Sequence, residues 1–348
     1  MQDRPPPPAP SASPTGPARR RFPPPPPLVA QPAGLWRRTP PAIFPPVMGL
    51  LGLGLGWRLL AEMLANPAIG ALAEAALGAV ALLYLFCAVA WLAKPLRHPG
   101  ALIDELQVLP GRAGVAAGVL SLSLLAAVMM LYAPGLALIM VAVSSALLLG
   151  LGALVLWVLA RGPAEGRVVT PVFHLLFVGH ILAPLTLVPL GFLRLSTLIL
   201  VLTICAAVLI WAVSAVQLLR RVPPAPLRPL LAIHLAPASL GATISALLGW
   251  SGWATGFALL ALALLAALVA SGRWLLAAGF SPLWGALTFP LAACAGAVTY
   301  AFGASTAGLA LGAGLLLAGT ALTVTVALRV MTDWAKGKLA AKTNAASI

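Results

Sequence analysis

The chain has 348 residues, of which 61% are hydrophobic and only 8% are charged, and its net charge is +14. An ordinary soluble domain is about 45–50% apolar and about 25% charged, so this composition excludes a soluble globular protein. The basic excess would suit a nucleic-acid-binding protein, but the basic residues gather at the ends of apolar stretches, which indicates membrane topology and no nucleic-acid partner.

The first 38 residues differ in kind from the rest of the chain. Proline runs at Pro5–Pro8 and Pro23–Pro27 surround a cluster of arginines. This composition predicts a disordered or polyproline II tail over residues 1–38, on the cytoplasmic side. No apolar stretch long enough for a secretory signal precedes Ile43, so we expect none in this segment.

Apolar stretches occupy most of the remaining chain. A transmembrane helix needs about 20 mostly apolar residues, because the hydrocarbon layer is about 30 Å thick. The sequence predicts an all-α integral membrane protein with ten such helices in five hairpins within a domain of residues 39–330, followed by a short basic cytoplasmic tail at 331–348. The expected spans are 40–64, 69–93, 113–132, 136–160, 170–192, 195–219, 229–249, 252–272, 281–302 and 304–328.

Basic residues predict how these helices cross the membrane. With the N-terminus in the cytoplasm, all of the 21 Lys and Arg residues except Arg58 and Arg194 lie on the cytoplasmic side. The positive-inside rule therefore predicts an even number of spans with both termini cytoplasmic, in a cell (inner) membrane.

Prolines divide the helices into two groups. Interior prolines fall in the first, fifth, seventh and ninth spans, and polar residues favour the odd spans as well. Proline removes an intrahelical hydrogen bond, which is tolerated where the freed carbonyl faces protein or water. We therefore expect the odd helices to form a central ring and the even helices to face lipid, although the third span lacks an interior proline. The interior prolines are Pro45, Pro46, Pro184, Pro189, Pro237 and Pro290.

Other chemistry finds little support in the sequence. Gly52 and Gly56 have the spacing of close helix packing, and no strand precedes them as a nucleotide-binding loop would require. His174 and His180 are six residues apart, roughly 120° around a helix, so they cannot form an i, i+4 metal-ligand pair. No acid lies deep in a span and no nucleophile with its base can be assembled, so we expect no metal site, no cofactor and no enzyme.

Four segments resemble the tellurite-resistance and dicarboxylate transporter family, which includes bacterial TehA and plant slow-type anion channels. They are TPPAIFPPVMGLLGLGLGWR, TPVFHLLFVGHILAPLTLVPLG, HLAPASLGATIS and SPLWGALTFPLAACAGAVTY, in the first, fifth, seventh and ninth spans. The resemblance implies five hairpins with the odd helices around a central pore, in a homotrimer of separately conducting subunits.

The resemblance also implies roles for particular residues. The phenylalanine that plugs the family's pore corresponds to Phe289, and an apolar plug can block ions by excluding water. An Asn-Phe pair common in the family's fifth helix is His180-Ile181 here; this departure puts a second aromatic plug in doubt, and the histidine would add a titratable polar group. The other candidates for the pore lining are His180, Pro45, Pro237, Ser239, Thr243, Thr288 and Pro290.

The function predicted from the sequence is a passive anion channel or exporter gated by a phenylalanine. Its partners would be the lipid bilayer and small inorganic or carboxylate anions, with chloride, nitrate, sulfite, tellurite and C4-dicarboxylates as candidates. Two alternatives stay open: a proton-linked C4-dicarboxylate or sulfite carrier, and a nonconducting membrane scaffold that recruits partners through the proline-rich tail.

Overall fold

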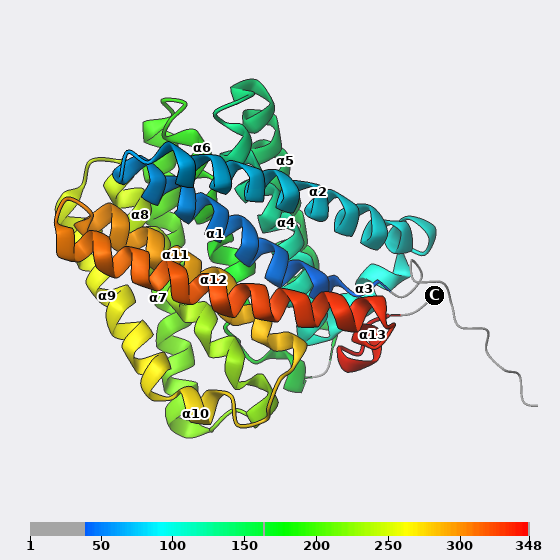
Figure 1. Ribbon diagram of the computed structural model, residues 1–348. Helices are drawn as coiled ribbons and strands as arrows, with labels where there is room; N and C mark the ends of the chain where they lie inside the picture. The colour runs from blue at the N-terminus through cyan, green and yellow to red at the C-terminus, as the bar shows by residue number, and fades with distance from the viewer. Residues whose placement is uncertain (1–38, 163, 347–348) are drawn as a thin grey trace, which may run out of the picture. The chain divides into compact units, whose positions relative to one another are not determined.

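The computed structural model describes residues 39–162 and 164–346. The chain divides into two units, Met1–Ala33 and Gly34–Ile348, and the account below concerns the described residues of the second unit. The tail predicted over residues 1–38 lies outside the described residues. All regular elements in the described part of the chain are helices, as the composition predicts (Figure 1).

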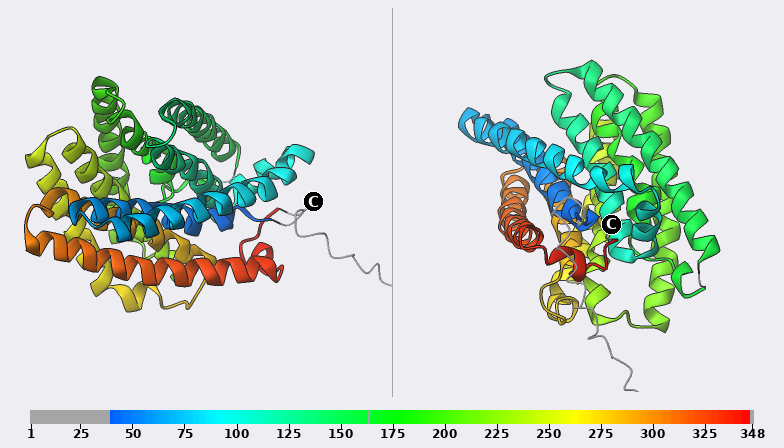
Figure 2. Two further views of the ribbon diagram at one scale, coloured as in Figure 1. Left: turned by 45° about the horizontal axis from the view of Figure 1, so that its top comes forward. Right: turned by 90° about the vertical axis from the view of Figure 1, so that its right-hand side faces the viewer.

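Nine helical segments in the described residues are long and apolar enough to cross a membrane. Successive helices pack as hairpins, α1 with α2, α4 with α5, α8 with α9 and α11 with α12 (Figure 2). The eighth α-helix is short and reaches spanning length only with the 3₁₀ helix η6 before it. The segments are α1 (Phe44–Met63), α2 (Pro67–Arg97), α4 (Leu109–Met129), α5 (Pro134–Arg161), α7 (Leu193–Arg220), η6 (Ala225–His234) with α8 (Leu235–Leu247), α9 (Ser251–Ala270), α11 (Gly285–Phe302) and α12 (Thr306–Ala335).

Local sequence explains where several of these helices begin. Proline occupies the first turn of α1, α2, α4 and α5, where its missing N–H costs nothing and its fixed φ suits the helix. Asn66 caps α2 by accepting the backbone N–H groups of Ala68 and Ile69 at 3.1 and 3.2 Å. Ser305 caps α12 in the same way, accepting the N–H of Gly308 at 3.1 Å.

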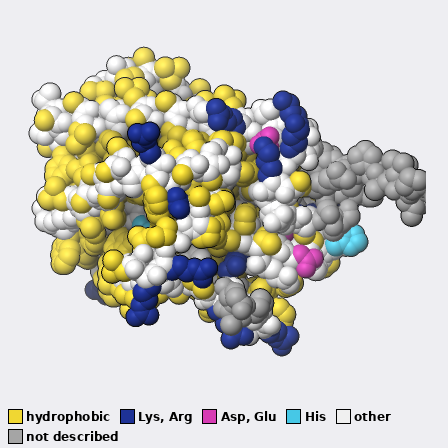
Figure 3. All heavy atoms as spheres, turned by 90° about the horizontal axis from the view of Figure 1, so that it is seen from below, with side chains coloured by type: hydrophobic (Ala, Val, Ile, Leu, Met, Phe, Trp, Pro, Cys, Tyr) yellow, Lys and Arg dark blue, Asp and Glu magenta, His cyan; other side chains and the backbone are white. Residues whose placement is uncertain are grey.

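The expected division into inner and outer helices is confirmed. Between 56% and 83% of the most apolar window is buried in α1, α4, η6 with α8, and α11, against 17% to 33% in α2, α5, α7, α9 and α12. The most buried of them is α4, the third span, although it has no interior proline. The outer helices expose leucines such as Leu72, Leu82 and Leu209, and hydrophobic side chains cover much of the face in Figure 3. Such a surface suits contact with lipid.

The fifth span is not the continuous helix that the sequence predicts over residues 170–192. It consists of a π-helical turn η4 (His174–Val178), a 3₁₀ turn η5 (Gly179–Leu182) and one turn of α-helix, α6 (Pro184–Leu187). Pro184 and Pro189 cannot donate backbone hydrogen bonds, and each removes one bond that a regular helix through this segment would make. This segment is apolar but too short and irregular to count as a spanning helix, so the predicted number of ten is not confirmed.

The connection expected between Lys94 and Arg112 is largely helical, because α2 runs on to Arg97, α3 (Gly100–Gln107) follows, and α4 begins at Leu109. Lys94 and Glu105 are each 1% exposed and form an ion pair. The Lys94 ammonium also donates to the carbonyl of Ala346 at 3.0 Å. Burial raises the pKa of the Glu105 carboxyl although the Lys94 charge opposes that rise. This pair ties α2, α3 and the chain's last described residues together on one side of the domain.

The Lys94–Glu105 pair gives a test of this packing. Lys94→Met alone should lower the thermal unfolding midpoint in detergent, because it leaves a buried carboxyl without its counter-charge at a cost of about 3–5 kcal/mol. Lys94→Met with Glu105→Leu should recover most of this loss. As a control, Lys342→Met removes a pair with Asp333 whose lysine is 46% exposed, and should change the midpoint little. A double variant as unstable as Lys94→Met alone would contradict this assignment.

Candidate functional site

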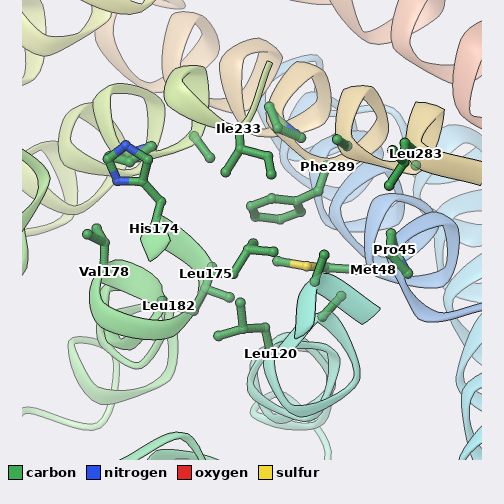
Figure 4. A pocket seen from close by; sticks show the side chains of 18 of the residues that line it. Pro45, Met48, Leu120, His174, Leu175, Val178, Leu182, Ile233, Leu283 and Phe289 are labelled. Carbon is green, nitrogen blue, oxygen red and sulfur yellow. The ribbon is translucent and has the colours of Figure 1, made fainter. Parts of the chain in front are cut away.

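Two cavities lie end to end among the inner helices. The near cavity, of about 60 Å³, is on the side where α1, α4 and α11 begin. No Lys, Arg, Asp or Glu side chain of the described residues borders it, and its one ionisable neighbour is His174. Its wall is therefore almost entirely apolar, as Figure 4 shows. The lining includes Pro45, Met48, Leu120, His174, Leu175, Val178, Leu182, Ile233, Pro237, Leu283, Phe289 and Pro290.

The far cavity, of about 310 Å³, lies toward the other ends of α1, α4 and α11. Its wall is more polar, because Arg58 and Glu62 of α1, Thr243 of α8 and Tyr300 of α11 border it. A charged solute in the far cavity would therefore meet polar side chains, whereas one in the near cavity would meet mainly carbon atoms.

Phe289 of α11 borders both cavities and is 6% exposed. Figure 4 shows its ring extending from α11 between Ile233, Leu175 and Met48. Leu240 of α8 borders both cavities as well. The ring thus stands at the boundary between the two spaces.

Two glycines of α1 allow α11 to come close enough to place this ring. A Cβ atom on Gly52 would lie 2.9 Å from Cδ2 of Phe289, and one on Gly49 would lie 2.4 Å from Cβ of Thr288. The Thr288 hydroxyl donates to the carbonyl of Gly285 at 2.7 Å and lies 3.1 Å from that of Pro45. The α1–α11 contact therefore determines where the ring lies.

The structure gathers some of the predicted pore residues and separates others. Pro45, Pro237 and Pro290 border the near cavity, and Thr243 borders the far cavity. Because proline has no N–H, Pro290 leaves the carbonyl of the residue four earlier, Ala286, without its usual intrahelical partner at the cavity wall.

Three of the predicted residues do not line either cavity. Ser239 is fully buried, and its hydroxyl donates to the carbonyl of Leu235 at 2.9 Å. Thr288 is fully buried in the α1–α11 contact. His180 is half-buried in η5. Whether any of these residues acts on a permeating ion stays a prediction.

A histidine pair, of which His174 borders the near cavity, was not predicted from the sequence. Nε2 of His174 lies 2.8 Å from Nδ1 of His234, with the rings nearly perpendicular at 86°. Trp211 donates to the backbone carbonyl of His234 at 3.2 Å, which helps to hold that segment. The residues are 60 positions apart, and the one available signal was that both lie early in odd spans. No group of three or more His, Cys, Asp or Glu suited to a metal ion occurs among residues 39–162 and 164–346.

Arg58 was also not predicted from the sequence to border a cavity. It borders the far cavity and is 9% exposed, and its Nε and Nη2 donate to the Glu74 carboxylate at 2.5 and 2.7 Å. The Tyr132 hydroxyl donates to the same carboxylate at 2.6 Å. In a sequence, a basic residue near the end of a span indicates topology. The sequence does not reveal that the side chain also borders a cavity.

Comparison with known proteins agrees with this architecture. No curated protein matches the chain. A family model described as SLAC1, voltage-dependent anion channel, matches residues 38–331, which include both cavities and nearly all of the helical domain. The match also confirms the family predicted from the four sequence segments. The chain therefore belongs to the voltage-dependent anion channel (SLAC1) family of membrane channels and transporters.

Proposed function

We propose that this protein is a passive pore for small anions and that Phe289 closes it. Family membership establishes an anion channel or transporter that is not an enzyme. The observation that carries the proposed gate is the position of Phe289, on the boundary between two cavities that lie along the inner helices. An apolar side chain at such a constriction excludes water, and an ion cannot cross a dry constriction without losing its hydration shell.

The wall of the pore supports passive conduction. Of the described residues, no carboxylate borders the near cavity and only Glu62 borders the far cavity, whereas proton relays in coupled transporters use chains of ionisable side chains. The N-terminal ends of α1 and α11 lie at the near cavity, and helix N-termini carry partial positive charge that favours anions. Selectivity would then depend on pore width and dehydration cost. Chloride, nitrate, sulfite, tellurite and C4-dicarboxylates are the candidate ions, weakly discriminated.

The remaining parts of the proposal concern the protein's setting. The asymmetric distribution of basic residues supports cytoplasmic termini in a cell (inner) membrane. The family resemblance supports a homotrimer in which each subunit conducts through its own cavities. The tail at residues 1–38 and the basic tail at 331–348 would both be cytoplasmic. The second tail begins within α12, which ends at Ala335, and it contains the short helix α13 (Leu339–Lys342).

The histidine pair supports a second candidate function, a proton-linked carrier. His174 borders the near cavity and shares a hydrogen bond with His234. If each ring gained a proton, both of the facing nitrogens would be donors and the bond would break. A carrier could use this change to couple anion movement to protons.

Replacing Phe289 tests the proposed gate. Phe289→Ala should raise anion flux into proteoliposomes at fixed voltage by about tenfold or more, which corresponds to about 1.4 kcal/mol off the barrier. Phe257→Ala on α9 is the matched control, because Phe257 packs against Gly241 and borders neither cavity. Equal flux in the parent protein and in folded Phe289→Ala would contradict the gate.

Gly52→Ala tests how the gate is held. The added methyl group would lie 2.9 Å from the Phe289 ring, so the ring must shift away from α1 and flux should rise. The same change should add nothing in a Phe289→Ala background, because no ring remains to be displaced. Gly296→Ala is the control, because Gly296 also borders the far cavity but a Cβ atom there would have no other atom within 4 Å. It should leave flux unchanged. Additive effects of Gly52→Ala and Phe289→Ala would show that Gly52 does not act through the ring.

A pH gradient separates the passive pore from the carrier. With nitrate as the probe at fixed voltage, a passive pore should give the same flux with and without a gradient. The carrier requires flux to depend on the gradient in the parent protein and to lose this dependence in His174→Asn. A gradient-dependent flux that His174→Asn abolishes would replace the first proposal by the second.

A further inference from the structure

Arg58 lies between the far cavity and an adjoining space. Its side chain borders the far cavity and also a second space of about 350 Å³ between the end of α1, the start of α2 and Leu131. Of the described residues, Arg58 is the only Lys or Arg on the far cavity. An anion that enters the far cavity through this adjoining space, here called the opening, passes this guanidinium.

The hydrogen bonds of Arg58 leave part of its guanidinium available. Nε and Nη2 each donate to Glu74 at short distances, but Nη1 and Nη2 reach the carbonyl of Val128 only at 3.5 Å, the limit of a hydrogen bond. A guanidinium carries five N–H donors in a rigid plane. One N–H of Nη1 and one of Nη2 point the same way and could therefore bind a stronger partner than the Val128 carbonyl. An anion is the partner that a guanidinium binds best.

Glu74 orients the guanidinium without facing the far cavity. Its carboxylate borders the opening and not the far cavity, and it accepts hydrogen bonds from both Arg58 and Tyr132. Tyr132 is exposed, and its hydroxyl, which is protonated at neutral pH, donates to Glu74; this hydrogen bond raises the pKa of Tyr132. Glu74 and Tyr132 are therefore positioning residues for the Arg58 side chain.

One carboxylate opposes Arg58 inside the far cavity. Glu62 lies one helical turn beyond Arg58 on α1 and borders the same space, but it makes no ion pair within the described residues. The Thr243 and Tyr300 hydroxyls also border this space and can donate to an anion. The balance between Arg58 and Glu62 sets how strongly an anion is held.

We propose that Arg58 forms an anion-binding site in the far cavity, which favours small oxyanions and carboxylates because they accept two parallel N–H groups. The inference rests on the proposed passage of anions through this pore and names the residue that selects them before they reach Phe289. Nitrate and the planar carboxylate groups of succinate fit the fork of a guanidinium better than spherical chloride does.

The test compares nitrate binding in four variants by two readouts. The first is the nitrate concentration that gives half-maximal flux in proteoliposomes. The second is the nitrate concentration that gives half of the maximal thermal stabilisation in detergent. Arg58→Gln with Glu74→Gln keeps a hydrogen-bonded pair of zero net charge but removes the guanidinium. It should weaken nitrate affinity about tenfold, equivalent to about 1.4 kcal/mol. Arg58→Lys should give an intermediate loss for nitrate and a smaller loss for chloride, because a lysine cannot form the two parallel bonds.

Two further variants complete the set. Glu62→Gln should tighten nitrate binding, because it removes the opposing charge from the far cavity. Arg194→Gln removes an exposed charge at the start of α7 that borders neither cavity, and it should leave affinity unchanged. Unchanged affinity in the folded Arg58→Gln, Glu74→Gln protein would overturn the site, as would an equal loss in Arg194→Gln. If the double variant does not fold, equal nitrate affinity in Arg58→Lys, Glu62→Gln and the parent overturns the site.

The stabilisation readout separates this inference from the proposed function. Nitrate stabilisation that depends on Arg58, with no flux in the parent or in Phe289→Ala, would keep the binding site and reject the passive pore. Flux that rises in Phe289→Ala but saturates equally in all four variants would keep the pore and reject the site.

Discussion

Every backbone amide group in a lipid bilayer needs a partner within the protein, and this requirement explains the arrangement of the helices. The chain breaks regular hydrogen bonding in the fifth span, before α8 and within α11, at Pro184, Pro229, Pro237 and Pro290. All of these breaks lie on inner segments, where protein surrounds them. The helices α5, α7, α9 and α12 have no interior proline and can face hydrocarbon. Proline alone does not decide the layer, because α4 is buried without an interior proline and the outer helix α2 contains Pro95 near its end.

Small residues determine where the one large ring between the cavities lies. Gly49 and Gly52 bring α1 against α11, and Thr288 bridges from the first turn of α11 to the carbonyl of Pro45. Phe289 is the next residue, so this contact fixes its backbone while the ring rests on Gly52. The position of the ring is therefore a property of two packed helices. A change in the angle between α1 and α11 would move it without any change in its own rotamer.

Composition, apolar length and proline positions were sufficient to predict an all-α membrane domain and its inner and outer helices. They failed at the fifth span, because hydropathy reports that a segment is apolar and cannot distinguish a regular helix from π and 3₁₀ turns around Gly179 and Pro184. The positions of Pro45, Pro237 and Phe289 at cavity walls followed from residue type and the family resemblance. The contacts His174–His234 and Arg58–Glu74 join different helices, and no single-helix pattern contains them.

The two cavities differ in both size and polarity, about 60 Å³ with an apolar wall against about 310 Å³ with Arg58, Thr243 and Tyr300 in the wall. An anion entering by the far cavity can keep polar contacts until it reaches Phe289, whereas one entering by the near cavity loses its water at the entrance. Under the proposed function, the free-energy profile along the pore is therefore not symmetric about the ring. Even with equal anion concentrations on both sides, the proposed pore should rectify, which means that opposite voltages of the same size drive unequal currents.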